Sequence, residues 1–522
     1  MNKQTYSFII FLIVLLIVHL SAMICNSFET IDDAFISFRY AENLAVGNGL
    51  VFNPGERVEG YTNFLWILLL ALVRPLVEPV LASKILGALC SCLLIIFFAR
   101  YYRRFHPEIF GFPILYLALD PGLITWSVRG LETTMFTLFI WLAYQTAMTA
   151  SIKRNDTSAG LAGSMAAFAV LTRPEGVLTH LFFPLLVLLQ KPREHSIFKR
   201  ISYFFIGSLT LMLPYLIWKW CYFGDILPNT FYAKTGGGFS VFWRGLAYII
   251  QGWQWPEGIL LIVIFISLCR NEKKGLNRHA VLVAAVFLLI FLAYILAVGG
   301  DSLGPDRFLT PLLPFMILPA FFALSILKIL RDQQTHRFLV GIVAFILIIG
   351  NSYPMIANFQ HTDVFSHKKE LQHHGTHVGL CLAKNARPNQ SIATSIIGRI
   401  PYYSKLYTFD VFGLIDPYIA HQTLEGSARG AAGHEKSDWY YILSRNPDFI
   451  IGQELIAAPP REPNWLKSIR TSLSGESTYQ IPSGIPAPPY PGYSRIELSC
   501  DGPIIRIWKR NPRPEQEHVL MP

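Results

Sequence analysis

Three long apolar runs constrain this chain more than any other feature of its sequence. They extend from Phe8 to Ile24, from Leu81 to Ala99 and from Ala280 to Val298. Each approaches the roughly 20 residues that an α-helix needs to cross the hydrocarbon core of a bilayer. Hydrophobic residues make up 52% of the chain and charged residues only 15%, which excludes a set of soluble domains. We therefore predict a polytopic α-helical membrane protein.

The basic residues orient the chain in the membrane. A net charge of +10 would suggest a nucleic-acid partner in a soluble protein, but here Lys and Arg lie in short loops between apolar runs, so we predict no nucleic acid. One threading places every basic cluster on the cytoplasmic side. The clusters are Arg100/Arg103/Arg104, Lys153/Arg154, Lys191/Arg193/Lys199/Arg200, Arg270/Lys273/Lys274/Arg278 and Lys328/Arg331/Arg337.

This threading predicts about eleven spans in the inner (plasma) membrane. The first run is retained and the N-terminus is cytoplasmic, because only Lys3 precedes the run and no small-residue cleavage site follows it. The apolar stretch from Phe64 to Leu76 is too short to cross and is placed along the outer interface. Residues 1–357 then form a transmembrane module with a first outer loop over 26–79.

Residues 358–522 are predicted to form an extracytoplasmic α/β domain, because hydropathy falls there while Pro, Gly, Tyr and charged residues increase. Short β-like runs at Ser391–Ile397, Asp448–Ile451 and Ile504–Trp508 accompany a helix-like stretch at Ser437–Ser444. No glycine motif for nucleotide binding is present in the sequence, so nothing indicates nucleotide hydrolysis.

Cysteine and histidine spacing bears on disulfide and metal chemistry. Cys381 and Cys500 fall in the polar C-terminal part and are free to pair if that part is extracytoplasmic. Histidines also cluster after the last predicted span, at His361, His367, His373, His374 and His377. Only His373 and His377 share a helix face, and no carboxylate follows at a fixed distance, so we predict no metal site.

The stretch beyond the first apolar run carries the most informative polar residues. Asp32 and Asp33 are adjacent acids at the expected water interface. They can accept protons in a reaction, or they can cap the helix that begins near Phe35, where acids are favoured. We favour chemistry, because the loop continues with a second polar run, Asn53-Pro-Gly-Glu-Arg57-Val-Glu59-Gly60-Tyr61-Thr-Asn63.

Short motifs spread over most of the chain resemble one family. The loop motifs are Asp32 to Phe35, Glu56-Arg57-Val58, Tyr61-Thr62 and Leu65-Trp66. The later motifs are Ser127 to Thr133, Leu171 to Gly176, Pro228-Asn229-Thr230 with Tyr232 to Lys234, Gly300-Asp301 with Arg307-Phe308, Gly413 to Pro417, and Gly433 to Lys436. Together they resemble the C-type glycosyltransferase superfamily (GT-C), and especially the terminal arabinofuranosyltransferases of actinobacterial cell walls.

The resemblance implies an inverting membrane glycosyltransferase with a GT-C-like fold, a polyprenyl-phosphate sugar donor and an envelope glycan or glycolipid acceptor, working beside membrane lipid. It implies a pentofuranose such as arabinofuranose, although another sugar remains open. Asp32 is then the catalytic base, because a carboxylate must take the proton of the attacking hydroxyl. Asp33 would orient Asp32, contact the acceptor or hold a divalent cation; no cofactor is otherwise predicted.

Four basic residues on the predicted outer side suit the donor phosphate. They are Arg57, Arg173, Lys234 and Arg307. The positive-inside bias disfavours them there, and phosphate binding gives each a reason. The alternative for each is a salt bridge to Glu59, Glu175 or Asp306.

Six further residues are predicted to bind substrate: Glu59, Tyr61, Asn63, Glu132, Asn229 and Asp301. For Glu132 the alternative is that it caps the helix beginning near Thr133 and pairs with Arg129. Competing readings of the whole chain are a transporter or flippase of a lipid-linked or anionic substrate, and a ligase or flippase partner without chemistry of its own. The absence of a repeated half argues against transport.

Overall fold

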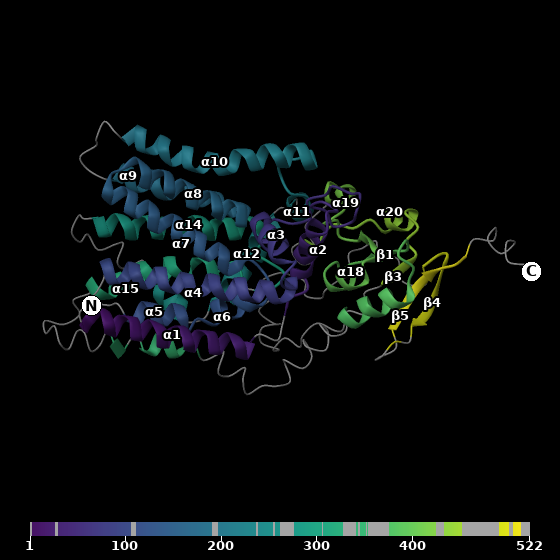
Figure 1. Cartoon of the computed structure of the whole chain (residues 1–522), viewed down its shortest axis with the longest axis horizontal. Helices are drawn as coiled ribbons and strands as arrows, with labels where there is room; N and C mark the ends of the chain where they lie inside the picture. The colour runs from purple at the N-terminus through teal and green to yellow at the C-terminus, as the bar shows by residue number, and fades with distance from the viewer. Residues whose placement is uncertain are drawn as a thin grey trace, which may run out of the picture. The chain divides into compact units, whose positions relative to one another are not determined.

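A computed structural model describes residues 3–26, 30–105, 111–189, 197–235, 239–253, 256–261, 276–304, 306–326, 341–342, 345–350, 352, 375–423, 433–451, 490–498, 500 and 505–512. The chain divides into two compact units (Figure 1). The first consists of Met1–Thr30, Thr62–Ile226 and Arg244–Thr362. The second consists of Ile31–Tyr61, Leu227–Trp243 and Asp363–Pro522. The boundary predicted near residue 357 lies outside the described residues.

The first unit is helical. Its elements are α1 (Lys3–Asn26), α3 (Phe64–Val73), α4 (Pro79–Phe105), α5 (Gly111–Ala118), α6 (Pro121–Val128), α7 (Thr133–Lys153), α8 (Asp156–Thr172), η2 (Pro174–Leu181), α9 (Phe182–Leu189), α10 (Ile197–Phe223), α14 (Leu276–Val298), η3 (Thr310–Leu312) and α15 (Leu313–Ile326). Helix α12 (Phe239–Gly252) has residues in both units.

Five described helices, α1, α4, α7, α10 and α14, are long and apolar enough to cross a membrane. A sixth span results if α5 and α6, bent by 45°, are counted as one. The chain is therefore a helical membrane protein, and the larger number of about eleven spans stays a prediction. Helix α3 has 10 residues, a rise of about 15 Å against a hydrocarbon core of about 30 Å.

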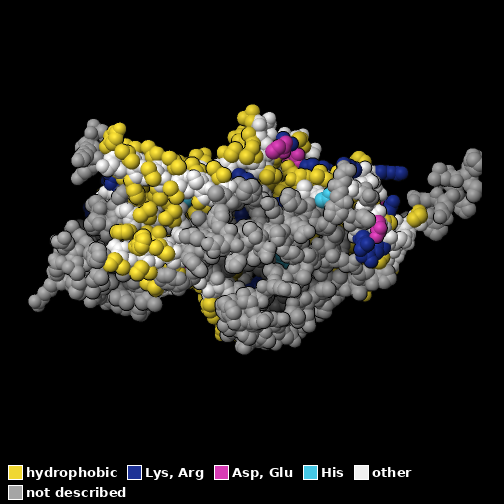
Figure 2. All heavy atoms as spheres, turned by 90° about the horizontal axis from the view of Figure 1, so that it is seen from below, with side chains coloured by type: hydrophobic (Ala, Val, Ile, Leu, Met, Phe, Trp, Pro, Cys, Tyr) yellow, Lys and Arg dark blue, Asp and Glu magenta, His cyan; other side chains and the backbone are white. Residues whose placement is uncertain are grey.

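The surface of the helical unit is apolar to an extent that water would not tolerate. Helix α1 exposes Ile13 and Ile17 by 51% and 58%, and helix α10 exposes Phe198 and Ile217 by 82% and 57%. On one face of the molecule, hydrophobic side chains form a broad patch (Figure 2). Contiguous apolar surface of this kind marks contact with lipid or a partner, and on helices of spanning length we assign it to lipid.

Glycines allow two of the helices to approach closely. A Cβ atom added at Gly163 of α8 would overlap the backbone carbonyl of Phe204 in α10, and one added at Gly207 of α10 would overlap the carbonyl of Gly160 in α8. Small residues at such contacts are typical of helix pairs in membranes, where close backbone packing replaces the hydrophobic effect. The pair carries Arg173 at the C-terminal end of α8.

The second unit contains a five-stranded mixed sheet in the order β2-β1-β3-β5-β4. Strand β1 pairs in parallel with β2 and β3, and β5 pairs antiparallel with β3 and β4. The elements of this unit are α2 (Ala34–Ala45), α11 (Asn229–Lys234), a helix over 375–385, β1 (Ser391–Thr394), α18 (Arg399–Ser404), β2 (Tyr407–Asp410), α19 (Pro417–Ala420), α20 (Trp439–Ser444), β3 (Phe449–Ile451), β4 (Tyr493–Leu498) and β5 (Ile505–Arg510). The three predicted β-like runs and the helix before β3 are confirmed.

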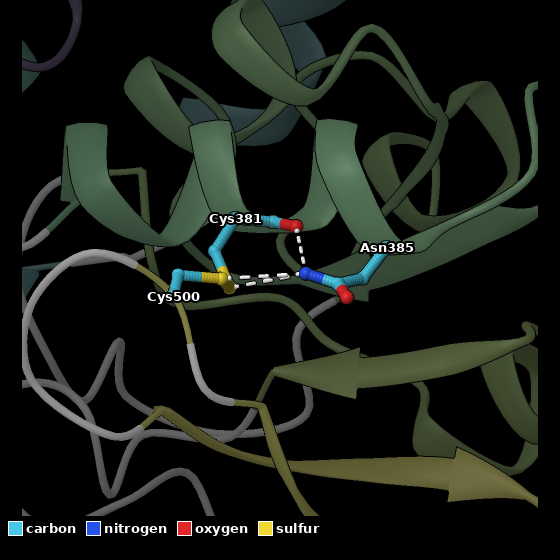
Figure 3. Close-up of a disulfide and its surroundings, with 3 residues drawn as sticks. All are labelled: Cys381, Asn385 and Cys500. Atoms are coloured by element: carbon cyan, nitrogen blue, oxygen red, sulfur yellow. Dashed lines mark hydrogen bonds between the residues drawn. A yellow bond between two sulfur atoms is a disulfide. The ribbon is translucent and has the colours of Figure 1, made fainter.

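A disulfide joins Cys381 to Cys500, with Cα atoms 5.8 Å apart (Figure 3). Cys381 lies in the helix over 375–385 and packs in the core against Leu382, Ile392 and Ile505. The Asn385 side-chain amide donates to the Cys381 carbonyl oxygen at 2.9 Å. The bridge ties this helix to the residues just before β5.

Removing this disulfide is expected to destabilise the second unit. The bridge closes a loop over 119 residues, and cross-links over loops of this size typically contribute about 2 to 5 kcal/mol. Chemical denaturation of Cys381→Ser/Cys500→Ser, followed by tryptophan fluorescence to which the buried Trp439 contributes, measures the loss. Cys221→Ser, at an exposed free cysteine, is the control. Equal midpoints in the two variants would contradict the prediction.

Candidate functional site

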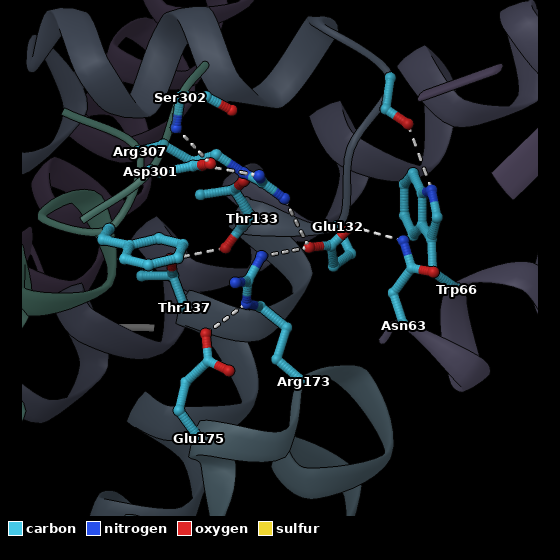
Figure 4. A network of polar contacts seen from close by, with 12 residues as sticks. Asn63, Trp66, Glu132, Thr133, Thr137, Arg173, Glu175, Asp301, Ser302 and Arg307 are labelled. Carbon is cyan, nitrogen blue, oxygen red and sulfur yellow. Dashed lines mark hydrogen bonds and ion pairs between the residues drawn. The ribbon is translucent and has the colours of Figure 1, made fainter. Parts of the chain in front are cut away.

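A buried network of ionised side chains lies at one end of helix α7 in the first unit (Figure 4). Glu132 is only 1% exposed and lies immediately before α7. Its Oε1 accepts hydrogen bonds from Arg173 at 2.6 Å and from Arg307 at 3.1 Å. Its Oε2 accepts one from the Asn63 amide at 2.7 Å. The network thus joins four predicted site residues, with a fifth, Asp301, accepting from Arg307 at 2.7 Å.

The local sequence explains how these side chains reach one another. Gly130 adopts a φ of +91°, which ends α6 and turns the chain into α7. Pro174 disfavours helical backbone at the preceding residue, so α8 ends and Arg173 is extended (φ −156°, ψ 141°). Glu175 follows within the same turn and accepts from Arg173 Nε.

Electrostatics keep Glu132 ionised despite its burial. Desolvation alone would raise the pKa of this carboxyl, but the Arg173 and Arg307 guanidiniums beside it and the Asn63 amide hold the pKa below its usual range. The capping role that was the alternative for Glu132 is wrong. It occupies the N-cap position without a capping bond, and the Arg129 guanidinium lies over the Trp126 ring at 5.2 Å.

Arg173 and Arg307 differ in which carboxylates they bind and in whether a buried hydrogen-bond donor remains unused. Arg173 binds two carboxylates and lies over the Phe308 ring at 5.0 Å, so the predicted salt bridge to Glu175 is confirmed. Arg307 pairs with Asp301 instead of the predicted Asp306. Its Nε is buried and has no hydrogen-bond partner among the described residues. A buried guanidinium with an unused donor is suited to an anionic oxygen.

In the second unit, Asp32 is held by backbone donors. Its Oδ2 accepts from the N–H of Gly398 at 3.1 Å and its Oδ1 from the N–H of Arg399 at 2.9 Å. Burial raises its pKa to about 6, against these hydrogen bonds and with a contribution from neighbouring Asp33. Asp33 occupies the N-cap position of α2 without a side-chain capping bond. Sequence reasoning missed Gly398 and Arg399, because no motif marks them.

Other predicted site residues of the second unit build its loops. Asn229 donates its backbone N–H to the Glu59 carbonyl at 3.0 Å and its side-chain amide to the Gly413 carbonyl at 2.8 Å. These contacts bring the segments around residues 59, 229 and 413 together within the second unit. The exposed Lys234 side chain lies next to Gly433, since a Cβ there would be 3.0 Å from Lys234 Cε.

The remaining predicted residues are placed as follows. Arg57 is exposed, whereas Glu59 and Tyr61 are buried at 4% and 3% exposure. Of the clustered histidines, only His377 belongs to the described residues; His361, His367, His373 and His374 lie outside them. Within the described part of the chain, no group of three or more His, Cys, Asp and Glu residues could hold a metal ion.

Comparison with families and curated proteins gives the following matches. Residues 362–491 match a family model described as a domain of unknown function, DUF8728. Over 339 residues the chain is 26% identical to the terminal beta-(1->2)-arabinofuranosyltransferase of Corynebacterium glutamicum, covering 55% of this chain and 48% of that protein. Over 235 residues it is 27% identical to the enzyme of the same name from Mycobacterium tuberculosis, covering 42% and 36%. The matches thus span less than half the length of these relatives.

Solved structures match over more of the chain. ArnT from Cupriavidus metallidurans in the apo state has a TM-score of 0.58 at 13% identity, covering 81% of this chain and 90% of that one. The same protein bound to undecaprenyl phosphate has a TM-score of 0.54 at 14% identity, covering 78% and 86%.

Proposed function

We propose that this chain, a distant homologue of the terminal arabinofuranosyltransferases with an ArnT-like fold, is an inverting GT-C glycosyltransferase. It moves a sugar from a polyprenyl-phosphate donor to an envelope glycan or glycolipid on the outer face of the membrane. The observation that carries this proposal is the pair of buried guanidiniums, Arg173 and Arg307, on either side of Glu132. The Nε atom of Arg307 has no hydrogen-bond partner among the described residues.

The guanidinium pair suits the donor phosphate. An anionic oxygen placed at Arg307 Nε would receive a charge-assisted hydrogen bond in a buried setting, where such bonds are strong. Glu132 holds both guanidiniums in place before the lipid arrives, so little reorganisation is needed when charge develops on the leaving phosphate. Arg57 and Lys234 are exposed and are proposed as further phosphate contacts, while Arg173 pairs with Glu132 and Glu175 and so positions the carboxylate that holds Arg307.

The reaction is a single displacement with Asp32 as the base. An acceptor hydroxyl oxygen attacks the anomeric carbon, the bond from that carbon to the phosphate oxygen breaks, and its electron pair leaves with the polyprenyl phosphate. The Asp32 carboxylate takes the hydroxyl proton. Attack from the side opposite the phosphate inverts the anomeric configuration. Substrate-binding roles are also proposed for Asp33, Glu59, Tyr61, Asn63, Asn229 and Asp301.

The site is proposed to face the outside of the inner membrane. Helix α7 has 21 residues, a rise of about 30 Å, and carries Glu132 at its start and basic Lys153 in its last turn. By the positive-inside rule the Lys153 end is cytoplasmic, which puts Glu132 outside. The Cys381–Cys500 disulfide supports an oxidising compartment for the C-terminal residues. About eleven spans are part of this proposal.

Transfer from defined donors tests the function. The purified chain in lipid nanodiscs would be given synthetic polyprenyl phosphates carrying a pentofuranose, a pentopyranose or a hexose, with envelope glycans as acceptors. We expect transfer from the pentofuranose donor, as the relatives' names suggest, with an inverted anomeric centre by NMR. In sealed vesicles, movement of the lipid-linked donor to the opposite leaflet without glycan product would favour a flippase instead.

Arg307→Ala is expected to weaken donor binding about 10- to 150-fold, because a hydrogen bond to a charged group contributes roughly 1.5 to 3 kcal/mol. Acceptor affinity should change little. Titration of nanodisc-bound protein with the fluorescent lipid donor measures the difference. Arg506→Ala, at an exposed ion pair with Glu497 in the second unit, is the matched control. Equal donor affinity in Arg307→Ala and the control would sink the assignment.

A further inference from the structure

We propose that Gly398 and Arg399 are positioning residues for the Asp32 carboxylate, so that the C-terminal domain of unknown function forms part of the active site. This inference rests on the proposed function, in which Asp32 accepts the acceptor's proton. It concerns contacts within the second unit alone. Gly398 and Arg399 lie within the region matched by the DUF8728 family model.

The carboxylate is oriented by two donors that cannot swing away. Each of its oxygens accepts one backbone N–H, at 3.1 Å from Gly398 and 2.9 Å from Arg399. A carboxylate oxygen has two lone-pair positions, so each keeps one for a substrate proton. Backbone donors at the start of α18 are fixed by the helix itself, whereas side-chain donors would add rotamer freedom. The Asp32 carboxylate is therefore held in a single orientation.

Glycine at position 398 is required by this close approach. A Cβ atom there would lie well inside 3.0 Å of the Asp32 backbone oxygen and of its carboxylate. Gly398 has a φ of −85°, so the requirement is steric contact with Asp32 and not a left-handed backbone. The identity of this residue is therefore explained by the acid that it holds.

The segment that begins with Asp32 and includes helix α2 is held to the same region at two further points. The buried Arg39 side chain donates to the carbonyls of Pro401 at 2.7 Å and Leu406 at 2.8 Å. The Asn53 amide donates to the Thr408 carbonyl at 2.9 Å and accepts the Thr408 N–H at 3.1 Å, as a strand neighbour would. These buried polar groups are matched only when the two segments are together.

Packing and charge complete the arrangement. The Phe35 ring lies against the Tyr402 ring, with centroids 5.3 Å apart. The Arg399 guanidinium lies over the Phe35 ring, 4.5 Å from its centroid. Arg399 also donates to the Thr376 hydroxyl at 3.0 Å. The charged groups that act on Asp32 are therefore Arg399, which stabilises its ionised form, and Asp33, which disfavours it. The two N–H donors favour the ionised form as well.

Two substitutions at one residue separate the backbone donor from the side chain. Arg399→Ala removes the guanidinium and keeps the N–H, whereas Arg399→Pro removes both. Proline is tolerated at the first position of a helix, and Arg399 is that position in α18. Proline also restricts the backbone of the preceding Gly398, whose ψ is −95°, so the difference between the two variants reports the loss of the N–H together with that restriction.

We expect the acid limb of the kcat/KM profile to lie about one pH unit higher in Arg399→Pro than in Arg399→Ala, because losing a donor to the charged form raises the pKa of the base. The KM for donor should be equal in both. Difference infrared spectroscopy follows the Asp32 carboxyl band as pH changes, with the band assigned by its loss in Asp32→Asn. The midpoint of this titration should shift in the same direction as the kcat/KM profile, and its measurement needs no turnover.

Gly398→Ala tests the steric contact. We expect kcat to fall about 100-fold through displacement of the carboxylate. Gly375→Ala is the matched control, since a Cβ there would make only ordinary contacts of 3.6 Å with Arg399. Two results would overturn the positioning role alone, provided that the wild type is active. One is that the kcat/KM profiles of Arg399→Ala and Arg399→Pro coincide, and the other is that Gly398→Ala has the same kcat as the control. A wild type that transfers from no donor overturns the proposed function and the positioning role with it, while an unmoved infrared band overturns the hold on Asp32 independently.

Discussion

Replacing Asp32 with Asn is expected to lower turnover by about two to four orders of magnitude while the donor still binds. Asparagine keeps the shape of the side chain but removes the group that accepts the proton. Transfer of radiolabelled sugar from a synthetic polyprenyl-phosphate donor measures kcat, and lipid titration measures donor affinity. Asp33→Asn is the neighbouring control and should have the milder effect.

The pH dependence of the wild type provides a second measurement on the same residue. Burial raises the pKa of Asp32 to about 6, so the base is protonated below this value and ionised above it. kcat/KM should therefore increase as pH rises through about 6 and then level off. Near-normal turnover in Asp32→Asn would move the base to Asp33 or Glu132, and a product of retained configuration would rule out single displacement.

Replacing Glu132 with Ala is expected to destabilise the helical unit by about 3 to 5 kcal/mol, because it leaves buried guanidiniums without their shared counter-charge. Arg173 would retain Glu175, and Arg307 would retain Asp301, so the loss comes from the centre of the network. The midpoint of denaturation in a mild detergent, followed by tryptophan fluorescence, gives the change.

The control for Glu132 is an ion pair of the opposite kind. Glu497 and Arg506 have side chains exposed by 56% and 59%, and exposed pairs typically contribute less than about 1 kcal/mol. Glu497→Ala should therefore shift the midpoint very little. If Glu132→Ala shifted it no further, the network would not stabilise the helical unit.

Whether a contact could be predicted from the sequence depended on how far apart its two residues lie along the chain. Runs such as Ser391–Ile397 carry their β pattern in adjacent residues, so β1 was predictable. The Arg173–Glu175 pair was equally visible, because the two residues are close in sequence. For Arg307 the sequence suggested a salt bridge to the adjacent Asp306. Its carboxylate partners are instead Asp301 and Glu132, and Glu132 is 175 positions away along the chain.

The same limit applies to Asp32. Its motif marked it as a candidate base, but its donors lie 366 and 367 positions further along, and backbone N–H groups leave no signature in residue types. The roles of the predicted site residues remain predictions. Their grouping around Glu132 came from the fold, because Asn63 and Glu132 are 69 positions apart on different elements.

The contact between Arg39 and Pro401 also sets an order of events during synthesis. The two residues are 362 positions apart, so at about 5 to 20 residues per second the ribosome needs roughly 20 to 70 seconds to supply the second after the first. Throughout that interval the early loop has emerged without the groups that fix its acid. The Asp32 carboxylate therefore acquires its two backbone donors only after residues 398 and 399 have been synthesised, and a nascent chain that stops before them leaves it without those hydrogen bonds.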